Sequence, residues 1–243
     1  MTVSVDLDVP PVALAIGAHP DDIEFGCGAT LAKWAAAGCT VHHLVLTDGS
    51  KGTWDPDADT AALVPVRQRE QRAAAAALGA TGEVVFLGQV DGELESTVAR
   101  RDQVAGVIRR LEPTVVLGHD PWKRYRLHPD HRHAGWLTVD AVVAARDPHF
   151  LRHHGQPHHR PTELLLFEAD EANHVEDVAG FEQTKLSALL EHASQLRSTM
   201  FIEPDDDGTQ EAAFRQRVLE RLAAHGALAG VALGESFHRV TGL

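Results

Sequence analysis

The chain has 243 residues, of which 44% are hydrophobic and 23% charged, a composition typical of globular proteins rather than disordered or fibrous ones. Acidic residues number 35 against 22 lysines and arginines, so the formal net charge is −13 with histidine neutral. Nucleic acids and anionic membranes both select a net basic surface, so this balance argues against both as partners. No apolar stretch approaches the roughly 18 residues that cross a bilayer.

Short apolar runs alternate along the chain with segments of helix-forming residues. Strands are expected at residues 12–17, 41–46, 84–87, 115–117 and 164–167. Helices are expected at residues 25–37, 67–78, 96–111, 130–145 and 183–196, the third of them capped by Ser96. Unbroken apolar strands that alternate with helices predict an α/β fold, with a Rossmann-like, mostly parallel sheet and helices on both faces. No repeat or linker divides the chain, so one domain over residues 1–243 is expected.

The cysteines and the N-terminal segment bear on where the protein works. Residues 1–9 carry Asp6 and Asp8 and no basic residue, which does not match a secretory signal peptide. Cys27 and Cys39 are too few for a disulfide framework, and both are expected in the core beside the first helix. These features favour a reducing, cytoplasmic location.

Ligands of open α/β sheets bind beyond the carboxyl ends of the strands. This rule selects three loops, at residues 18–24, 47–54 and 118–131, and the first and third hold the densest clusters of ionisable residues. The first loop follows a strand and opens a helix, as a dinucleotide-binding loop does. It carries three carboxylates where such a loop needs glycines, and a phosphate there would be repelled. We therefore reject a nucleotide site.

A metal ion fits these charges better. The chain holds 16 histidines, and two His-Pro-Asp segments stand at strand ends that are expected to be adjacent. Imidazole nitrogens with one carboxylate and an open position are typical of a catalytic zinc site. His19 and either Asp21 or Asp22 would come from the first loop, and His131 or His128 from the third. The remaining aspartate could then accept a proton from water at the metal.

These segments resemble a known family. A-H-P-D-D-I-E-F-G-C-G-A-T-L at residues 18–31 and H-P-D-H at 128–131 are similar to the LmbE-like (PIG-L type) zinc-dependent de-N-acetylases. Weaker matches follow in family order: R-Q-R-E at 67–70, A-L-G at 77–79, F-L-G-Q-V-D-G at 86–92 and S-Q at 194–195. The family includes deacetylases of N-acetylglucosaminyl conjugates in mycothiol, bacillithiol and glycosylphosphatidylinositol biosynthesis. The resemblance implies an LmbE-like fold and a zinc-dependent hydrolase that removes the acetyl group of an N-acetylated amino sugar.

The resemblance also implies roles for residues of the two loops. His19, Asp22 and His131 would bind zinc, with Fe²⁺ as an alternative because affinity order alone does not fix the ion in cells. Asp21 would be the general base. His128, held cationic beside carboxylates, would act as the acid or stabilise the oxyanion. No covalent intermediate is required.

Further roles follow from the resemblance outside the metal ligands. Asp130 would orient a histidine, and Arg67 and Asp91 would hydrogen-bond sugar hydroxyls. Some relatives have a tyrosine two positions before the residue that matches His128. Here that position holds Arg126, which would contact an acidic substrate group or take over at the oxyanion, and Tyr125 lies one residue earlier.

Three loops are expected to set substrate specificity, at residues 48–60, 120–127 and 146–162. Trp54 and Trp122 lie in two of them and would either stack on a sugar or pack as a lid. The third loop holds four histidines between residues 153 and 159, and we expect a polar surface loop there.

Three alternatives compete with the deacetylase. A conjugate amidase of the same family would cleave a larger amide. The pattern of His19, Asp21 and His131 also matches the 2-His-1-carboxylate site of iron oxygenases, but those enzymes are usually all-β barrels. A non-enzymatic metal- or sugar-binding protein would tolerate loss of the base. The expected partner is a small amino-sugar substrate, and an acidic α/β enzyme of this size is often a homo-oligomer.

Overall fold

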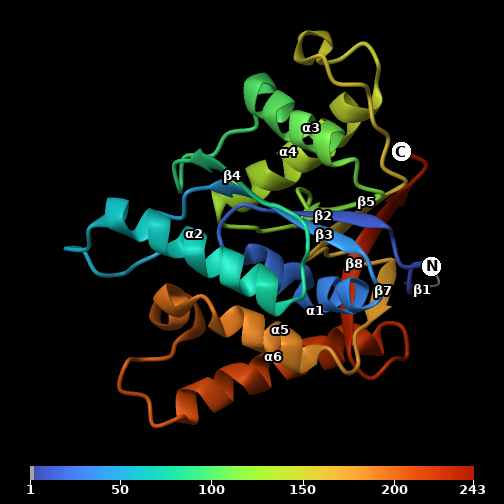
Figure 1. Ribbon diagram of the computed structural model, residues 1–243. Coiled ribbons are helices and arrows are strands. Elements are labelled where there is room, and N and C mark those ends of the chain that lie inside the picture. Colours follow the sequence, from blue (N-terminus) through green and yellow to red (C-terminus); the bar gives the residue numbers. More distant parts are fainter. Residues whose placement is uncertain (1–2) are drawn as a thin grey trace.

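The computed structural model describes residues 3–243, and its strands form one mixed sheet (Figure 1). The strands are β1 (Ser4–Val5), β2 (Val12–Gly17), β3 (Thr40–Thr47), β4 (Val84–Gln89), β5 (Val115–His119), β6 (Glu163–Phe167), β7 (His174–Asp177) and β8 (Gly234–Thr241). Their order across the sheet is β1-β7-β8-β6-β5-β2-β3-β4. β8 runs antiparallel to β6 and β7, and the other neighbouring pairs are parallel. The predicted α/β class with a mostly parallel sheet is confirmed.

Some of the helices begin or end at recognisable signals. They are α1 (Asp22–Ala36), α2 (Thr60–Ala77), α3 (Val98–Leu111), α4 (Pro129–Arg146), α5 (Glu182–Leu190) and α6 (Thr209–Ala227). The Asp59 carboxylate accepts hydrogen bonds from two backbone N–H groups in the first turn of α2, which a helix N-terminus otherwise leaves unpaired. Pro129 occupies the first position of α4, where its missing N–H costs nothing. Gly38, with φ of +96°, follows α1 and allows the chain to turn back.

Helices cover both faces of the sheet, as predicted. Alternate residues of a strand point to opposite faces, and in β2 Leu14 and Ile16 pack with α3 and α4. Ala13 and Ala15 pack on the other side with α1, α2 and α5. α6 lies outside this second layer, where its apolar residues pack with α1 and α5 in a third buried cluster. Figure 1 shows α3 and α4 above the sheet and the remaining helices below it.

Several elements differ from the sequence-based expectation. The strands β1, β7 and β8 and the helix α6 were not predicted, and α2 begins at Thr60 rather than at residue 67. The predicted helix over residues 183–196 ends at Leu190 and continues as a 3-10 turn and a π turn as far as Met200. Thr97, not Ser96, caps α3, because its hydroxyl accepts the hydrogen bond from the Arg100 N–H.

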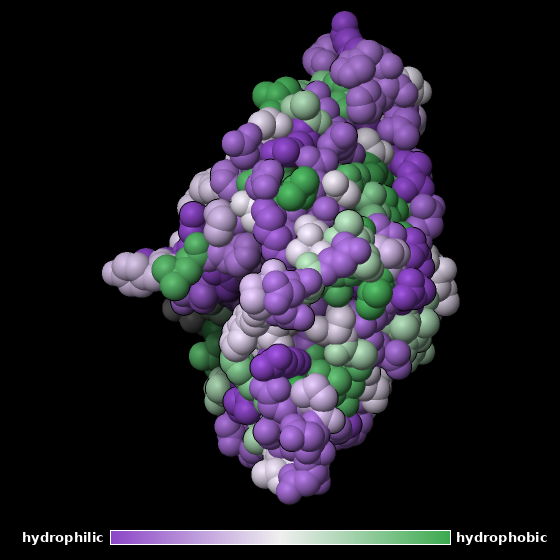
Figure 2. All heavy atoms as spheres, turned by 90° about the vertical axis from the view of Figure 1, so that its left-hand side faces the viewer, coloured by the Kyte–Doolittle hydropathy of each residue, from purple (hydrophilic) through white to green (hydrophobic). Residues whose placement is uncertain are grey.

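The carboxyl ends of the parallel strands face the left side of Figure 1. Seen from that side in Figure 2, most of the surface is hydrophilic, and the hydrophobic residues stand in separate small groups. The upper end is hydrophilic as well, and it corresponds to the loop that follows α4 in Figure 1. Within residues 3–243, no helix combines the length and the apolar character that crossing a bilayer requires.

Candidate metal centre and active-site cavity

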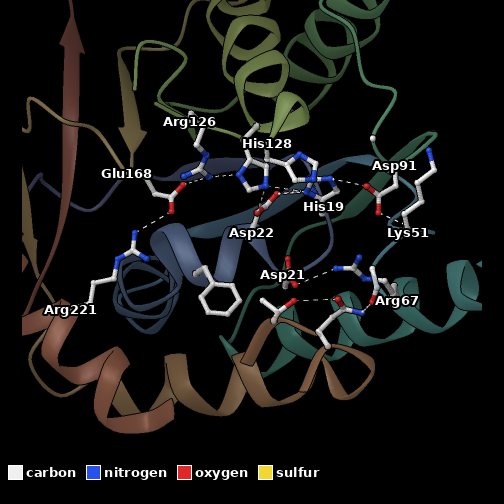
Figure 3. A pocket seen from close by; sticks show the side chains of 16 residues that line it. His19, Asp21, Asp22, Lys51, Arg67, Asp91, Arg126, His128, Glu168 and Arg221 are labelled. Carbon is white, nitrogen blue, oxygen red and sulfur yellow. Dashed lines mark hydrogen bonds and ion pairs between the residues drawn. The ribbon is translucent and has the colours of Figure 1, made fainter. Parts of the chain in front are cut away.

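A cavity of about 470 Å³ opens at the carboxyl edge of the sheet, where the three predicted loops meet (Figure 3). β5 pairs with β2, so the loops that follow these strands are neighbours although 112 positions separate His19 from His131. The cavity lining includes His19, Asp21, Asp22, Lys51, Arg67, Asp91, Arg126, His128, His131, Glu168, Gln195 and Arg221. Of the nine residues given roles from the sequence, Asp130 is the one outside this lining. It is fully buried behind the cavity.

Two imidazoles and one carboxylate converge at the centre of this cavity. His19 Nδ1 lies 3.1 Å from His131 Nε2 and 3.3 Å from Asp22 Oδ2. The other oxygen of Asp22 lies 3.2 Å from His131 Nε2. Ring nitrogens and a carboxylate that face one another at these distances form a compact donor set of the kind that binds zinc.

The second ring nitrogen of His19 is held by carboxylates. His19 Nε2 lies 3.1 Å from Asp130 Oδ2 and 3.2 Å from Asp91 Oδ1. Burial lowers the pKa of His19, but hydrogen bonds to Asp130, Asp22 and Asp91 outweigh it and raise the pKa well above its ordinary value. A proton donated from Nε2 to Asp130 leaves the lone pair on Nδ1, and this is how proteins orient histidine ligands of metals.

His131 is held differently. Its Nδ1 contacts the guanidinium of Arg126, and Arg126 also pairs with Glu168. A guanidinium can only donate hydrogen bonds. The contact therefore does not favour the tautomer of His131 that leaves the Nε2 lone pair free for a metal, in contrast to the carboxylates at His19.

His119, at the end of β5, brings a further ring nitrogen to this centre. This residue received no role from the sequence. Its Nε2 lies 3.3 Å from Asp22 Oδ2, and its ring stacks on that of His131 with centroids 4.5 Å apart. Burial raises the pKa of Asp22, but His131 and His119 outweigh it and hold the pKa well below its ordinary value. The Asp22 carboxylate is therefore charged and available to a cation.

The donor set suits a divalent ion, although its members are not fixed uniquely. Among residues 3–243, three overlapping triads have potential ligand atoms within 4.8 Å of one another: His19 with His128 and His131, Asp22 with His119 and His131, and His19 with Asp91 and Asp130. All three share residues with the convergence of His19, Asp22 and His131. The first two place nitrogen next to nitrogen or carboxylate, as borderline-soft ions prefer.

Asp21 and Asp22 are adjacent in the chain but have different surroundings. This difference bears on which of them faces the metal site, a choice that the sequence left open. Asp21 precedes α1 with φ of +109°, a conformation rare outside glycine. Such strain is concentrated at functional sites because the surrounding structure must hold it. The Asp21 N–H donates a 3.0 Å hydrogen bond to Gln71. The turn directs Asp22 toward His19, and Asp21 toward Arg67 (Figure 3). Asp22 also faces His131.

The electrostatics of Asp21 suit a proton acceptor. Burial raises the pKa of Asp21, Arg67 lowers it, and Asp22 raises it further, so that the pKa stands at about 6. A general base works best when its pKa lies near the operating pH. Arg67 approaches the Asp21 carboxylate at 3.2 Å.

A buried polar network lies behind Asp21. Gln71 donates to Glu24 Oε1 at 2.7 Å, and Glu24 Oε2 lies 3.2 Å from His192 Nε2. These three side chains and His43, which lies 3.1 Å from Gln71 Nε2, are all fully buried. The network received no role from the sequence, and its members lie too far apart in the chain for any spacing rule to join them.

His128 caps α4, where its Nδ1 accepts a 3.3 Å hydrogen bond from the Asp130 N–H. Its ring stands 4.7 Å from that of His19 and 4.9 Å from that of His131, measured between centroids. Burial, His19 and His131 lower the pKa of His128. The expectation that carboxylates hold this histidine cationic is therefore wrong in this structure, because burial and the neighbouring imidazoles together outweigh Asp130 and Asp22.

The predicted substrate contacts have partners within the protein. Arg67 is buried, and it donates to Gly49 O at 3.0 Å and to the carbonyl of Pro20 as well as to Asp21. Asp91 accepts a 3.0 Å hydrogen bond from the Lys51 N–H. Their roles toward a substrate stay predictions.

The exposed aromatic residues near the site do not line the cavity. The Tyr125 side chain is 88% exposed, whereas Arg126 lines the cavity. Trp54 packs edge-on against Phe201 at 6.1 Å, and Trp122 against Trp136 at 5.1 Å. The histidines between residues 153 and 159 also lie outside the lining.

The structure does not place the carboxylate that the iron oxygenase interpretation requires. That interpretation required Asp21 to face the metal beside His19 and His131, but Asp22 occupies that place and Asp21 pairs with Arg67. The fold is α/β rather than a β-barrel.

Comparison with known proteins identifies the family of this chain. The sequence profile of the PIG-L family, described as GlcNAc-PI de-N-acetylase, matches residues 14–142. The chain is 37% identical over 185 residues to the diacetylchitobiose deacetylase of Thermococcus kodakarensis, an alignment that covers 75% of this chain and 69% of that protein. The chain therefore belongs to the PIG-L family.

Two further similarities extend this result. A 1D-myo-inositol 2-acetamido-2-deoxy-alpha-D-glucopyranoside deacetylase of Streptomyces avermitilis is 34% identical over 169 residues, and the match spans 59% of this chain and 57% of that enzyme. The structure of the N,N'-diacetylchitobiose deacetylase from Pyrococcus horikoshii superposes with a TM-score of 0.85 at 28% identity, covering 96% of this chain and 85% of that one. The expected LmbE-like fold is confirmed.

Proposed function

We propose that this protein is a zinc-dependent hydrolase that removes the acetyl group of an N-acetylated amino sugar or its conjugate. The observation that carries the proposal is the convergence of His19 Nδ1, His131 Nε2 and Asp22 within 3.3 Å, beside an Asp21 that is not needed as a ligand. The names of the relatives, which are deacetylases of acetylated amino sugars, support the same reaction.

His19, Asp22 and His131 would hold the ion, and the histidine-carboxylate donor set favours zinc over magnesium or calcium. When bound, zinc polarises a carbonyl and lowers the pKa of water to about 7. Asp130 and Asp91 hold His19 in the orientation that points Nδ1 at the site.

The chain's own groups supply the proton transfers. Asp21, with its pKa at about 6, accepts the proton of the attacking water at neutral pH and can return it to the departing amine. Arg67 holds this carboxylate in place at 3.2 Å. His128, exposed at the start of α4, donates a hydrogen bond to the oxygen that becomes negative as the amide carbon turns tetrahedral.

Polar groups on one side of the cavity suit a sugar. Lys51, Asp91 and Arg67 lie together on this side (Figure 3), and Gln195 also belongs to the cavity lining. These groups offer both donors and acceptors to hydroxyl groups. Arg126 and Glu168 lie on the opposite side (Figure 3). We propose that residues 1–243 act as one deacetylase domain on such small-molecule substrates.

The proposal is tested by release of free amine from N-acetylglucosamine and its methyl glycoside. We expect activity that a chelator abolishes and added zinc restores, and an Asp21→Asn variant that keeps its metal but loses most turnover. A chelator-insensitive activity would contradict the metal site, and full turnover in Asp21→Asn would contradict the base. Absence of amine release from every acetylated amino sugar would overturn the function.

A further inference from the structure

A second, smaller cavity adjoins the first. It measures about 170 Å³ and lies between α1, α5 and α6. Phe25, Thr199 and Arg221 line both cavities, so a molecule bound at the metal centre could extend from one into the other. Figure 3 shows Arg221 beside Glu168 at this end of the first cavity, away from Lys51 and Asp91.

The floor of the second cavity is apolar. Phe25 and Phe214 meet edge-to-face with centroids 6.3 Å apart. Phe214, Val218 and Leu222 are buried on the inner side of α6, and Phe201 is 61% exposed at the rim. Aromatic and aliphatic walls of this kind bind the apolar part of a ligand.

The charged residues around this floor are of two kinds, a buried ion pair and the arginines of α6. Lys185 and Glu235 neutralise one another in a buried ion pair of 2.6 Å, and Glu235 also accepts hydrogen bonds from the N–H groups of Ala29 and Thr30. Lys185 donates in addition to the Phe25 carbonyl. This pair is satisfied within the protein and leaves no charge for a ligand.

Two guanidinium groups on α6 remain at the mouth of the cavity. Arg217 donates to the Met200 carbonyl at 2.9 Å, and no carboxylate among the described residues pairs with it within 4.0 Å. Arg221 lies 3.2 Å from Glu168, a carboxylate that it shares with Arg126. In a chain with a net charge of −13, this is a local excess of positive charge, and guanidinium groups bind carboxylate and phosphate well.

We propose that the second cavity is a subsite for an apolar group that carries an anionic substituent, attached to the amino-sugar substrate. The apolar part packs against Phe25, Phe214 and Val218, and Arg217 binds the anion. This inference rests on the proposed function. The same chemistry could belong to the aglycone of the sugar or to the acyl group of the amide, and the assays below separate these two sources.

The first assay compares substrates that differ in one group. The aglycone series consists of the methyl, phenyl and 4-carboxyphenyl glycosides of N-acetylglucosamine, and the acyl series compares N-acetyl with N-glutaryl glucosamine. We expect one series to show a higher kcat/KM for its anionic member, and that series identifies the source. Equal kcat/KM across both series would overturn the subsite, whereas amine release from none of the compounds would overturn the proposed function itself.

The second assay assigns the preference to a residue. Arg217→Gln should lower kcat/KM for the anionic substrate by about tenfold, the size of one charge-assisted hydrogen bond, and leave the methyl glycoside of N-acetylglucosamine unchanged. Arg215→Gln is the matched control, because Arg215 lies on the same helix, pairs with Glu211 and lines neither cavity. An equal loss in both variants, or no loss in either, would contradict the role of Arg217.

A binding measurement provides a readout that is independent of turnover. We expect 3-phenylpropionate, measured by calorimetry with the metal-loaded protein, to bind wild type about tenfold more tightly than Arg217→Gln, and Val218→Trp to reduce its binding by filling the cavity. A carboxylate that bound at the metal centre instead would be insensitive to both substitutions, and this result would refute the subsite.

Discussion

The contact between Asp130 and His19 gives a prediction about a residue that orients a metal ligand but does not itself bind the metal. Asp130 does not line the cavity, yet its Oδ2 lies 3.1 Å from His19 Nε2. The same carboxylate accepts hydrogen bonds from the N–H groups of Gly92 at 2.7 Å and Leu94 at 3.2 Å. An Asp130→Asn variant retains one acceptor oxygen and turns an NH₂ group toward a donor.

The expected loss can be worked out from these contacts. Removal of a carboxylate behind a histidine ligand typically costs 10- to 100-fold in metal affinity, or about 1.4–2.7 kcal/mol. One buried N–H is left without an acceptor, which costs about 1–3 kcal/mol of folding free energy. For a chain of this length that corresponds to a fall in Tm of roughly 2–12 °C.

The assay is a competition titration of zinc against a chromophoric chelator, together with a thermal melt of the metal-free protein. Asp140→Asn is the matched control, since Asp140 lies on the same helix and is exposed. The prediction is a weaker zinc affinity in Asp130→Asn and no change in the control. If Asp130→Asn bound zinc as tightly as wild type, the reasoning about the His19 tautomer would be refuted.

Further predictions concern the base, a ligand and the pH dependence of stability. Asp21→Asn should keep its zinc in elemental analysis but lose about 10²- to 10⁴-fold in turnover, and a loss under tenfold would exclude it as the base. His131→Ala should be depleted of zinc in the same analysis, and metal content at the wild-type level would show that the ligand set is wrong. Burial and then Arg221 lower the pKa of His225 from 6.5 to about 4, so between these values the unfolded chain binds more protons and the free energy of unfolding falls as the pH is lowered. Because the ring is part-exposed, the free energy of unfolding should fall by only about 1–2 kcal/mol over this pH range. Urea titrations that gave the same pH dependence for wild type and His225→Gln would contradict this prediction.

The sequence predicted those elements that are buried and consist of apolar residues. β2 and β5 are apolar runs, and they pair at the centre of the sheet as expected. β8 was missed because its eight residues, Gly234–Thr241, mix polar and apolar side chains. Glu235 is buried there because Lys185 and two backbone N–H groups satisfy it, a compensation that exists only once distant segments are assembled.

The site shows the same division. The motifs and the rule on strand ends brought His19, Asp22 and His131 into one cavity. Which of Asp21 and Asp22 faces the histidines depended on the positive φ of Asp21. The residue type does not predict this backbone conformation. His119 and Glu168 also stand at strand ends, at positions that the same rule could have selected.

The predicted substrate contact of Arg67 illustrates what a motif leaves out. The residue reaches the cavity as expected, but its guanidinium is engaged by Asp21 and by the carbonyls of Gly49 and Pro20. Hydrogen-bond partners of this kind come from loops whose conformation the sequence pattern does not specify.

The central claim is tested most directly by crystals of the zinc-soaked protein, with anomalous scattering recorded at the zinc absorption edge. We predict one strong peak within about 2.0–2.2 Å of His19 Nδ1, His131 Nε2 and an oxygen of Asp22, the usual lengths of such bonds. A peak at His19 Nε2 between Asp91 and Asp130, or no peak in this cavity, would contradict the account.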